Sequence, residues 1–211
     1  MSPAPRPGSW HITSRVEELS GERRANALRV LGLVVFYSIE VLNYRGLSFG
    51  GLEIPQVEGV DQTFHAMATA LTVAWIALSA GVLIALRNQF FPPALKYIST
   101  GFDLALLTSV LTLADGPRSP VLLLYFLLIP LAALRLSPRL VGFATLGTLV
   151  GYGCVLGDVA LRRPELAVPA HWAITTFAAL LLCGVVAHQL VSTARRAATR
   201  FHELEQRGGP S

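Results

Sequence analysis

Six long apolar stretches are the feature that most restricts how this chain can fold. They cover residues 26–44, 65–86, 98–114, 121–134, 140–157 and 170–191. A membrane-spanning helix needs roughly 20 mainly apolar residues, with a lower limit near 17. The fourth stretch is short, so we expect it to borrow length from Ser119–Pro120 and Arg135, or else to pair with the third stretch as a re-entrant hairpin. The pattern predicts an all-α polytopic membrane protein, a six-transmembrane-helix bundle.

The composition supports a membrane class and excludes several others. Hydrophobic residues make up 53% of the 211 residues and charged residues only 14%, whereas soluble domains carry roughly 25% charged residues. Two cysteines are too few for a disulfide framework. A soluble globular domain, a disordered chain and a disulfide-rich secreted domain are therefore excluded.

The positions of the basic residues predict the orientation of the chain. If the N-terminal side is the inner side, the inner segments hold 13 of the 17 Lys and Arg residues and the outer loops hold Arg45, Arg118, Arg162 and Arg163. By the positive-inside rule, both termini are cytoplasmic. We expect a cytoplasmic segment at 1–25, a transmembrane domain at 26–191 and a cytoplasmic juxtamembrane helix or tail at 192–211. Anionic lipid explains the net charge of +4, and a nucleic-acid partner is not indicated.

Three formally charged residues fall inside the expected spans: Arg29, Glu40 and Asp103. Arg29 sits in the first turn of its helix, where its side chain can reach the inner surface. Glu40 and Asp103 lie deeper, where an ionisable group usually faces a partner or a cavity. Each either makes a hydrogen bond between packed helices or belongs to a ligand or proton site.

Histidines lie at depths similar to those of the acidic residues. His188 is close in depth to Asp103, so the two could form a buried pair that titrates near neutrality. His65 and His171 open two helices near the depth of Glu40, an arrangement compatible with a haem or metal site. No dense ligand motif accompanies them, so we assign no metal, and haem is only an alternative.

The apolar pattern continues past the sixth stretch. Its seam has heptad spacing over Ala187, Leu190, Ala194, Ala197, Phe201 and Leu204. Such a seam is typical of a two-helix stem and favours a homodimer. The alternative is a basic amphipathic helix that lies on the membrane surface.

The region from Asp103 to Tyr152 carries a distinctive series of residues. Asp103 is followed by a tight outer turn, Asp115–Pro120, then by Tyr125, by Pro130 within the next helix and by Tyr152. This series resembles the six-span sensor region of bacterial histidine kinases, and the related membrane anchors of class III adenylate cyclases. The turn is most similar to that of redox-sensing kinases of the RegB type, which reads G-G-x-x-N-P-F.

The resemblance implies a bacterial inner-membrane sensor of a two-component system, with quinone as a possible ligand at the turn. Gly116 and Pro120 match the pattern, Ser119 stands for the Asn, and Val121 stands for the Phe. In a kinase of this kind the exit helix leads to a kinase domain. This sequence lacks that domain, so we expect either a kinase or cyclase effector on another chain or a fragment of a longer protein.

Three functions follow from these observations. The first is signal perception, in which a lipophilic or membrane-associated cue changes the bundle and the sixth helix carries the change to a cytoplasmic partner. The second is a small-molecule transporter or permease, and the third is a structural subunit without a ligand. No enzymatic motif is present, so we expect no catalysis. The expected ligand-binding residues are Glu40, His65, Asp103, Asp115, Gly116, Arg118, Ser119, Pro120, Tyr125 and His188.

Overall fold

The protein is helical throughout most of its length, as the sequence predicts. The computed structural model describes residues 9–45, 47–49, 52–54, 62–88, 92 and 94–207, with the side chains of 20–39, 41–42, 62, 64–88, 92 and 94–200. Its helices are α1 (Ser9–Arg45), α2 (Gln62–Arg87), α3 (Leu95–Leu113), α4 (Leu123–Ala133), α5 (Pro138–Arg162) and α6 (Ala170–Arg207). Short 3₁₀ helices are η1 (Gly116–Arg118), η2 (Pro120–Leu122) and η3 (Pro164–Leu166). Between α1 and α2, strands β1 (Leu47–Phe49) and β2 (Leu52–Ile54) pair antiparallel.

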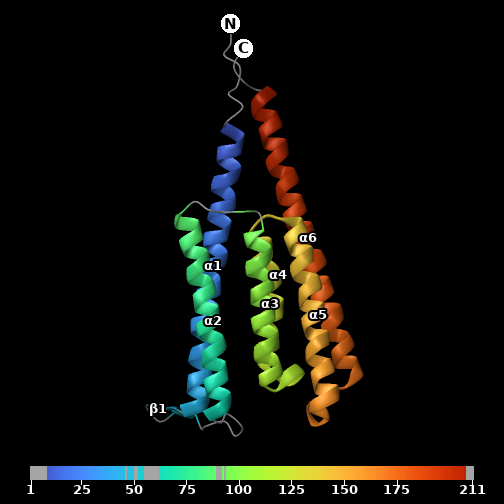
Figure 1. The fold of residues 1–211 in the computed structure, drawn as a ribbon. Helices are drawn as coiled ribbons and strands as arrows, with labels where there is room; N and C mark the ends of the chain where they lie inside the picture. The colour runs from blue at the N-terminus through green and yellow to red at the C-terminus, as the bar shows by residue number, and fades with distance from the viewer. Residues whose placement is uncertain are drawn as a thin grey trace.

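The helices stand side by side as an elongated bundle (Figure 1). Helices α1 and α6 extend beyond the others at the same end of the molecule. Helix α1 is continuous from Ser9 to Arg45, so the expected boundary between residues 25 and 26 does not interrupt the helix. The extended parts of α1 and α6 are therefore continuations of bundle helices.

Three helices are long and apolar enough to cross a membrane, by length and composition: Phe64–Arg87, Pro138–Arg162 and Ala170–Arg200. A shorter apolar helix covers Pro120–Ala133. The described residues thus contain fewer qualifying helices than the six we expected. Helix α4 has only 11 residues, and α3 includes Lys96 and Asp103 within its 19 residues.

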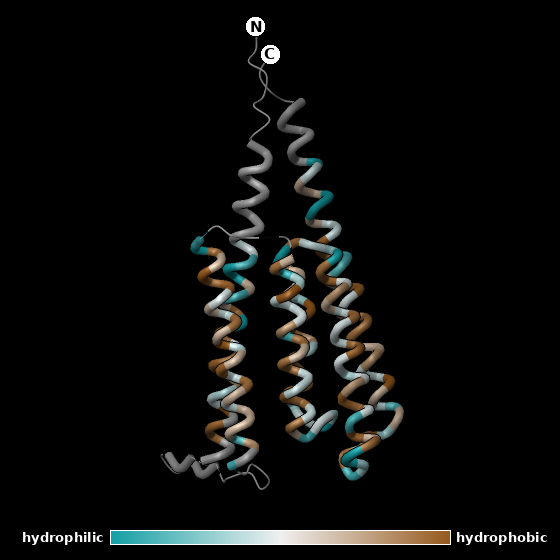
Figure 2. Tube along the Cα trace, in the orientation of Figure 1, coloured by the Kyte–Doolittle hydropathy of each residue, from teal (hydrophilic) through white to brown (hydrophobic). Residues whose placement is uncertain are grey.

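Hydrophobic residues recur along the helices of the bundle (Figure 2), and many of them are exposed. Large aliphatic side chains such as Val73, Leu146 and Leu182 are about 60% exposed, at 59%, 63% and 63%. A surface of this kind is unfavourable in water and favourable in lipid. The exposed apolar faces therefore agree with membrane association.

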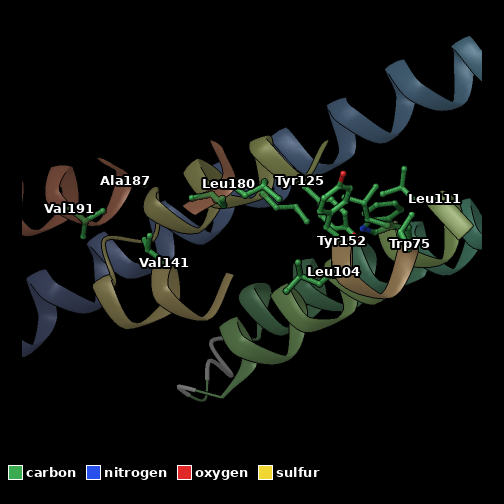
Figure 3. Close-up of a cluster of buried hydrophobic side chains, with 13 residues drawn as sticks. Trp75, Leu104, Leu111, Tyr125, Val141, Tyr152, Leu180, Ala187 and Val191 are labelled. Atoms are coloured by element: carbon green, nitrogen blue, oxygen red, sulfur yellow. The ribbon is translucent and has the colours of Figure 1, made fainter. Parts of the chain in front are cut away.

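The core lies where α3, α4, α5 and α6 meet, and Figure 3 shows Tyr125, Tyr152 and Trp75 among its buried side chains. Tyr125 is fully buried, and its hydroxyl lies 2.6 Å from Thr108 Oγ1 on α3. A Cβ at Gly151 would lie 2.6 Å from the Tyr125 hydroxyl, which only a glycine permits. The small-residue spacing Gly147-x-x-x-Gly151 therefore serves packing within the bundle.

The heptad seam on α6 lies only partly within the described side chains. Ala187 is buried against the core, whereas Leu190 is 66% exposed. The side chains of Phe201 and Leu204 lie outside the described residues. The dimeric stem stays a prediction.

Candidate ligand site

An ion pair buried between α1 and α3 is the basis of the candidate site. Arg29 NH2 lies 2.7 Å from Asp103 Oδ2, and Arg29 Nε donates to the same oxygen at 3.1 Å. Both side chains are 2% exposed. Two N–H groups of one guanidinium converge on the same carboxylate oxygen, which restricts the orientation of the pair. The pair therefore holds α1 and α3 in one register.

Trp75 on α2 and Asn26 on α1 complete the network. Trp75 Nε1 donates to Asp103 Oδ1 at 2.7 Å, so each carboxylate oxygen accepts from a different helix. Arg29 NH1 donates to Asn26 Oδ1 at 2.8 Å, and Asn26 Nδ2 donates to the carbonyl of Ser79 at 3.3 Å. One buried polar cluster, Asn26–Arg29–Trp75–Asp103, thus joins three helices.

A partly open cavity of about 460 Å³ lies beside this cluster, between α1, α2, α3 and α4. We call it the α1–α4 groove. Arg29, Trp75 and Asp103 line it together with apolar residues, namely Leu28, Leu31, Gly32, Leu33, Val35, Phe36, Leu107, Leu124, Leu127, Leu128, Pro130, Leu131 and Leu134. A mostly apolar wall with a few polar groups at one place is typical of a site for small lipophilic molecules.

A second buried ion pair joins α1 to the turn after α4. Arg135 Nε lies 2.8 Å from Glu22 Oε2, with side chains 4% and 1% exposed. The contact is an ion pair without hydrogen-bond geometry, and Glu22 Oε1 has no hydrogen-bond partner among the described residues. Arg135 NH1 also donates to the carbonyl of Lys96 and to Thr100 Oγ1, and NH2 donates to Ser99 Oγ. Arg135 therefore ties α1 to the first turns of α3.

Glu22 precedes the first expected span, and its burial disfavours the charged form of the carboxyl. This burial raises the pKa of the carboxyl above its ordinary value of 4.5, and the Arg135 guanidinium opposes the rise. The ion pair is thus what favours the charged form of Glu22 in its buried position.

The outer turn Asp115–Pro120 is held by structural contacts. Gly116 has a φ of +58°, and a Cβ there would lie 2.9 Å from Val159 Cγ2. A larger residue would therefore be strained in its backbone and crowded against Val159. Ser119 is buried and accepts from the backbone N–H of Val121 as a helix cap. Arg118 is exposed and donates to the carbonyl of Ala167 at 2.8 Å.

An ionic contact lies beside this turn, at the end of α5. Arg163 NH2 lies 3.1 Å from Asp158 Oδ2, and its guanidinium also donates to the carbonyls of Thr112 and Ala114. These bonds tie the end of α5 to the end of α3. Together with the packing of Gly116, they account for the turn without a ligand.

The structure corrects two predictions about charged residues. The predicted Asp103–His188 pair is not formed, because both Asp103 oxygens accept from Arg29 and Trp75 and His188 is exposed. Arg29 does not reach the inner surface, because its side chain turns into the bundle and binds Asp103. Neutralising Asp103 within the bundle is the physical reason for both differences.

The other predicted site residues do not converge. Tyr125 is buried in the core, His65 is half-buried near the start of α2, and the side chain of Glu40 lies outside the described residues. Over the side chains that are described, no group of three His, Cys, Asp or Glu could hold a metal ion. His171 is exposed at the start of α6, beside Trp172. The predicted outer site is therefore not assembled by the described residues.

Sequence reasoning missed Arg29 and Trp75 as partners of Asp103, and Asn26 as a partner of Arg29. One signal was present: Asn26 and Arg29 are three residues apart and so share a helix face. A cation and an anion within the same apolar domain also predict an ion pair, because neither charge is stable there alone.

Comparison with known proteins adds no assignment. No protein-family model, no curated protein and no solved structure matches this chain.

Proposed function

We propose that this chain is a six-span sensor domain of the bacterial inner membrane, with both termini in the cytoplasm and no catalytic activity. It perceives a lipophilic ligand in the α1–α4 groove and passes the change to a cytoplasmic partner, a kinase or a cyclase. Helices α1, α3 and α4 complete the membrane domain beside the three apolar helices. A homodimer through the end of α6 fits this role.

One observation carries the proposal: a mostly apolar groove has a buried, fixed ion pair in its wall. A lipid tail needs only an apolar surface, which the outside of the bundle already offers. Placing Arg29, Asp103 and Trp75 on the wall of the groove gives that surface a polar group with a defined orientation. This combination supports selective binding of one membrane-soluble molecule.

The contacts of α1 suggest how binding is transmitted. The described part of α1 is joined to α3 by Arg29–Asp103 and to the α4–α5 turn by Glu22–Arg135. A molecule seated between α1 and α4 pushes against a helix that both ion pairs hold. Because α1 and α6 both extend past the bundle at the same end, a tilt of α1 changes its position relative to α6 there.

The distribution of polar groups favours a sensor over a transporter. The inner cluster is centred on Asp103 and the outer one on the contact of Arg163 with Thr112. Nine residues along α3 separate Asp103 from Thr112, about 14 Å at 1.5 Å per residue. Buried Leu107 and Leu111 lie between them on the same helix. The Thr108 and Tyr125 hydroxyls also lie in this stretch, but they bond each other. No described ion pair joins the two clusters, which favours the sensor.

Binding in the groove is expected to change the distance between α1 and α6. Spin labels on Arg23→Cys and Arg195→Cys, both exposed in the structure, report this distance once Cys154 and Cys183 are replaced by alanine. Octadecane, methyl stearate and octadecyl sulfonate serve as probes in lipid nanodiscs. Helix movements in signalling are typically 1–2 Å or more, so at least one probe should shift the mean label distance by about 2 Å.

Two variants make this measurement decisive. Leu131→Trp fills the groove, and the shift should disappear. Leu146→Trp adds the same ring to an outward site that is 63% exposed, and the shift should persist. If no probe changes the distance in the labelled parent protein, or if both variants behave alike, the sensor function is wrong.

A further inference from the structure

We propose that α1 carries a latch at Gly21 and Glu22, which is pressed against the turn after α4 when the groove is filled and released when the groove empties. We call this contact of Gly21 and Glu22 with Leu134 and Arg135 the α1 latch. The inference rests on the proposed function, because it describes how occupancy of the same site is regulated and transmitted. It follows from two unlike attachments of α1 and from their positions along the helix.

The first attachment, at Arg29, holds α1 firmly. Arg29 Nε and NH2 donate to Asp103 Oδ2 at 3.1 and 2.7 Å, and Trp75 Nε1 donates to Asp103 Oδ1 at 2.7 Å. Among the described side chains, no buried polar atom that lacks a hydrogen-bond partner belongs to these three residues. Breaking a buried ion pair is costly, because it leaves an uncompensated charge away from water. Arg29 is therefore the fixed point of α1, about which the helix can rock.

The second attachment, the ion pair of the α1 latch, is much less satisfied. Glu22 Oε2 lies 2.8 Å from Arg135 Nε without hydrogen-bond geometry, and Glu22 Oε1 has no partner among the described residues. Burial raises the pKa of Glu22 although Arg135 opposes the rise, so the closed position disfavours the carboxylate. The guanidinium also donates to the carbonyl of Lys96 and to the hydroxyls of Ser99 and Thr100. Release of Glu22 into water therefore relieves an unfavourable burial and leaves Arg135 with these acceptors.

The backbone of α1 touches the turn directly at Gly21. A Cβ at this position would lie 2.9 Å from the carbonyl oxygen of Leu134 and 3.5 Å from Arg135 Cα. Both are backbone atoms, which cannot rotate aside as the end of a long side chain can. At Gly32, in the wall of the groove, no neighbouring atom that the structure describes lies within 4 Å of the Cβ position. Helix α1 therefore meets the turn closely at Gly21 and stands clear of its neighbours at Gly32.

The fixed point lies midway between the α1 latch and the far part of the groove wall. Arg29 is seven residues from Glu22 and seven from Phe36, about 10 Å in each direction at 1.5 Å per residue. Rocking of α1 about Arg29 therefore moves these two parts in opposite directions. A molecule seated in the groove beside Phe36 pushes that part of α1 away from α4 and presses the α1 latch against the turn. When the groove empties, α1 settles towards α4 and the latch is released.

Two spin labels report whether the α1 latch is closed. Arg23→Cys on α1 and Arg139→Cys at the start of α5 are both exposed positions, and they lie close in sequence to the two sides of the latch. The labelled protein is studied in lipid nanodiscs after both native cysteines are replaced by alanine. Release of the latch lengthens the mean distance between the labels, and closure shortens it.

Gly21→Ala is expected to hold the latch open, because the added methyl group meets the carbonyl oxygen of Leu134. Alanine suits a helix better than glycine, so the helix itself is retained. The mean label distance should lengthen by about 2 Å, the scale of helix shifts in signalling. Gly32→Ala makes the same change on the same helix at a position with free space, and should leave the distance unchanged.

A second substitution tests the coupling of the latch to the groove. Leu124 lines the groove, and its neighbour Tyr125 bonds to Thr108, five residues beyond Asp103 along α3. Leu124→Trp therefore adds bulk to the groove wall on the far side of the fixed point. Combined with Gly21→Ala, it should reverse at least half of the lengthening. Leu146→Trp, at an outward site that is 63% exposed, should reverse none of it.

The outcomes separate the latch from the proposed function. Equal label distances in Gly21→Ala and Gly32→Ala, or no reversal by Leu124→Trp, overturns the α1 latch. If octadecane, methyl stearate or octadecyl sulfonate still moves α1 relative to α6 in the parent protein, the proposed function stands without the latch. If none of these probes does so and Leu124→Trp nevertheless reverses the lengthening, the latch is retained and the proposed function fails.

Discussion

Asp103→Asn is expected to lower the free energy of unfolding by about 3–5 kcal/mol, the usual cost of removing one partner of a buried ion pair. The substitution keeps the shape of the side chain but leaves the Arg29 guanidinium, 2% exposed, without its counter-ion. Denaturation of the purified protein in detergent micelles, followed by circular dichroism, measures the change. This is the largest single-residue effect we expect.

Two controls accompany this prediction. Asp158→Asn weakens the partly exposed pair with Arg163, whose side chains are 20% and 27% exposed, and should cost less than about 1 kcal/mol. The double variant Arg29→Met and Asp103→Leu replaces the whole pair with apolar groups and should recover most of the loss. A loss at Asp103 no greater than that at Asp158 would contradict the assignment of a buried pair.

Arg135→Met is expected to lower the free energy of unfolding by about 2–4 kcal/mol at neutral pH. It removes the partner of Glu22 and the donors to Thr100 and Ser99. Unlike Arg29, the stranded Glu22 can neutralise itself by binding a proton. Burial already raises the pKa of Glu22, and loss of the opposing guanidinium raises it further. The same micelle denaturation measured at several pH values tests this.

The sign of the pH dependence follows from proton linkage. In Arg135→Met, the folded state holds the Glu22 proton more tightly than the unfolded state, so the stability of the variant falls as pH rises. The decrease begins near the ordinary pKa of 4.5 and ends at the raised folded-state pKa. Relative to the parent protein, the penalty should therefore be largest above the raised pKa and smaller at acidic pH, where only the loss of the hydrogen bonds to Ser99 and Thr100 and to the Lys96 carbonyl remains. A penalty that grows on acidification would contradict this account.

The helical segments and the positions needing a polar partner could be predicted from the sequence. Long apolar stretches specify helices directly, and a lone Asp103 within one of them requires a partner. The length of α4 was less predictable, because Ser119 caps η2 and the chain forms two 3₁₀ helices before α4 begins. The hydropathy pattern alone does not predict these local hydrogen bonds.

The identity of the partners could not be predicted in the same way. We predicted the Asp103–His188 pair because the two residues lie at similar depths along their helices. Depth does not indicate which helices are adjacent. Asp103 lies on α3 and meets α1 and α2 through Arg29 and Trp75, whereas His188 lies exposed on α6. Neighbour relations come from the packing of small residues, as at Gly184, where a Cβ would lie 2.4 Å from Thr145 Cγ2. Such close approaches emerge only in three dimensions.

The proposed function requires that the α1–α4 groove select one lipophilic molecule from the membrane. A photoactivatable diazirine side chain placed at Leu131 in the groove, and in a second protein at outward-facing Leu146, tests it in living cells. After illumination, mass spectrometry of the cross-linked protein identifies the adducts. We predict one dominant lipophilic adduct at position 131 and a mixture of bulk phospholipids at position 146. The same phospholipid mixture at both positions would contradict the claim.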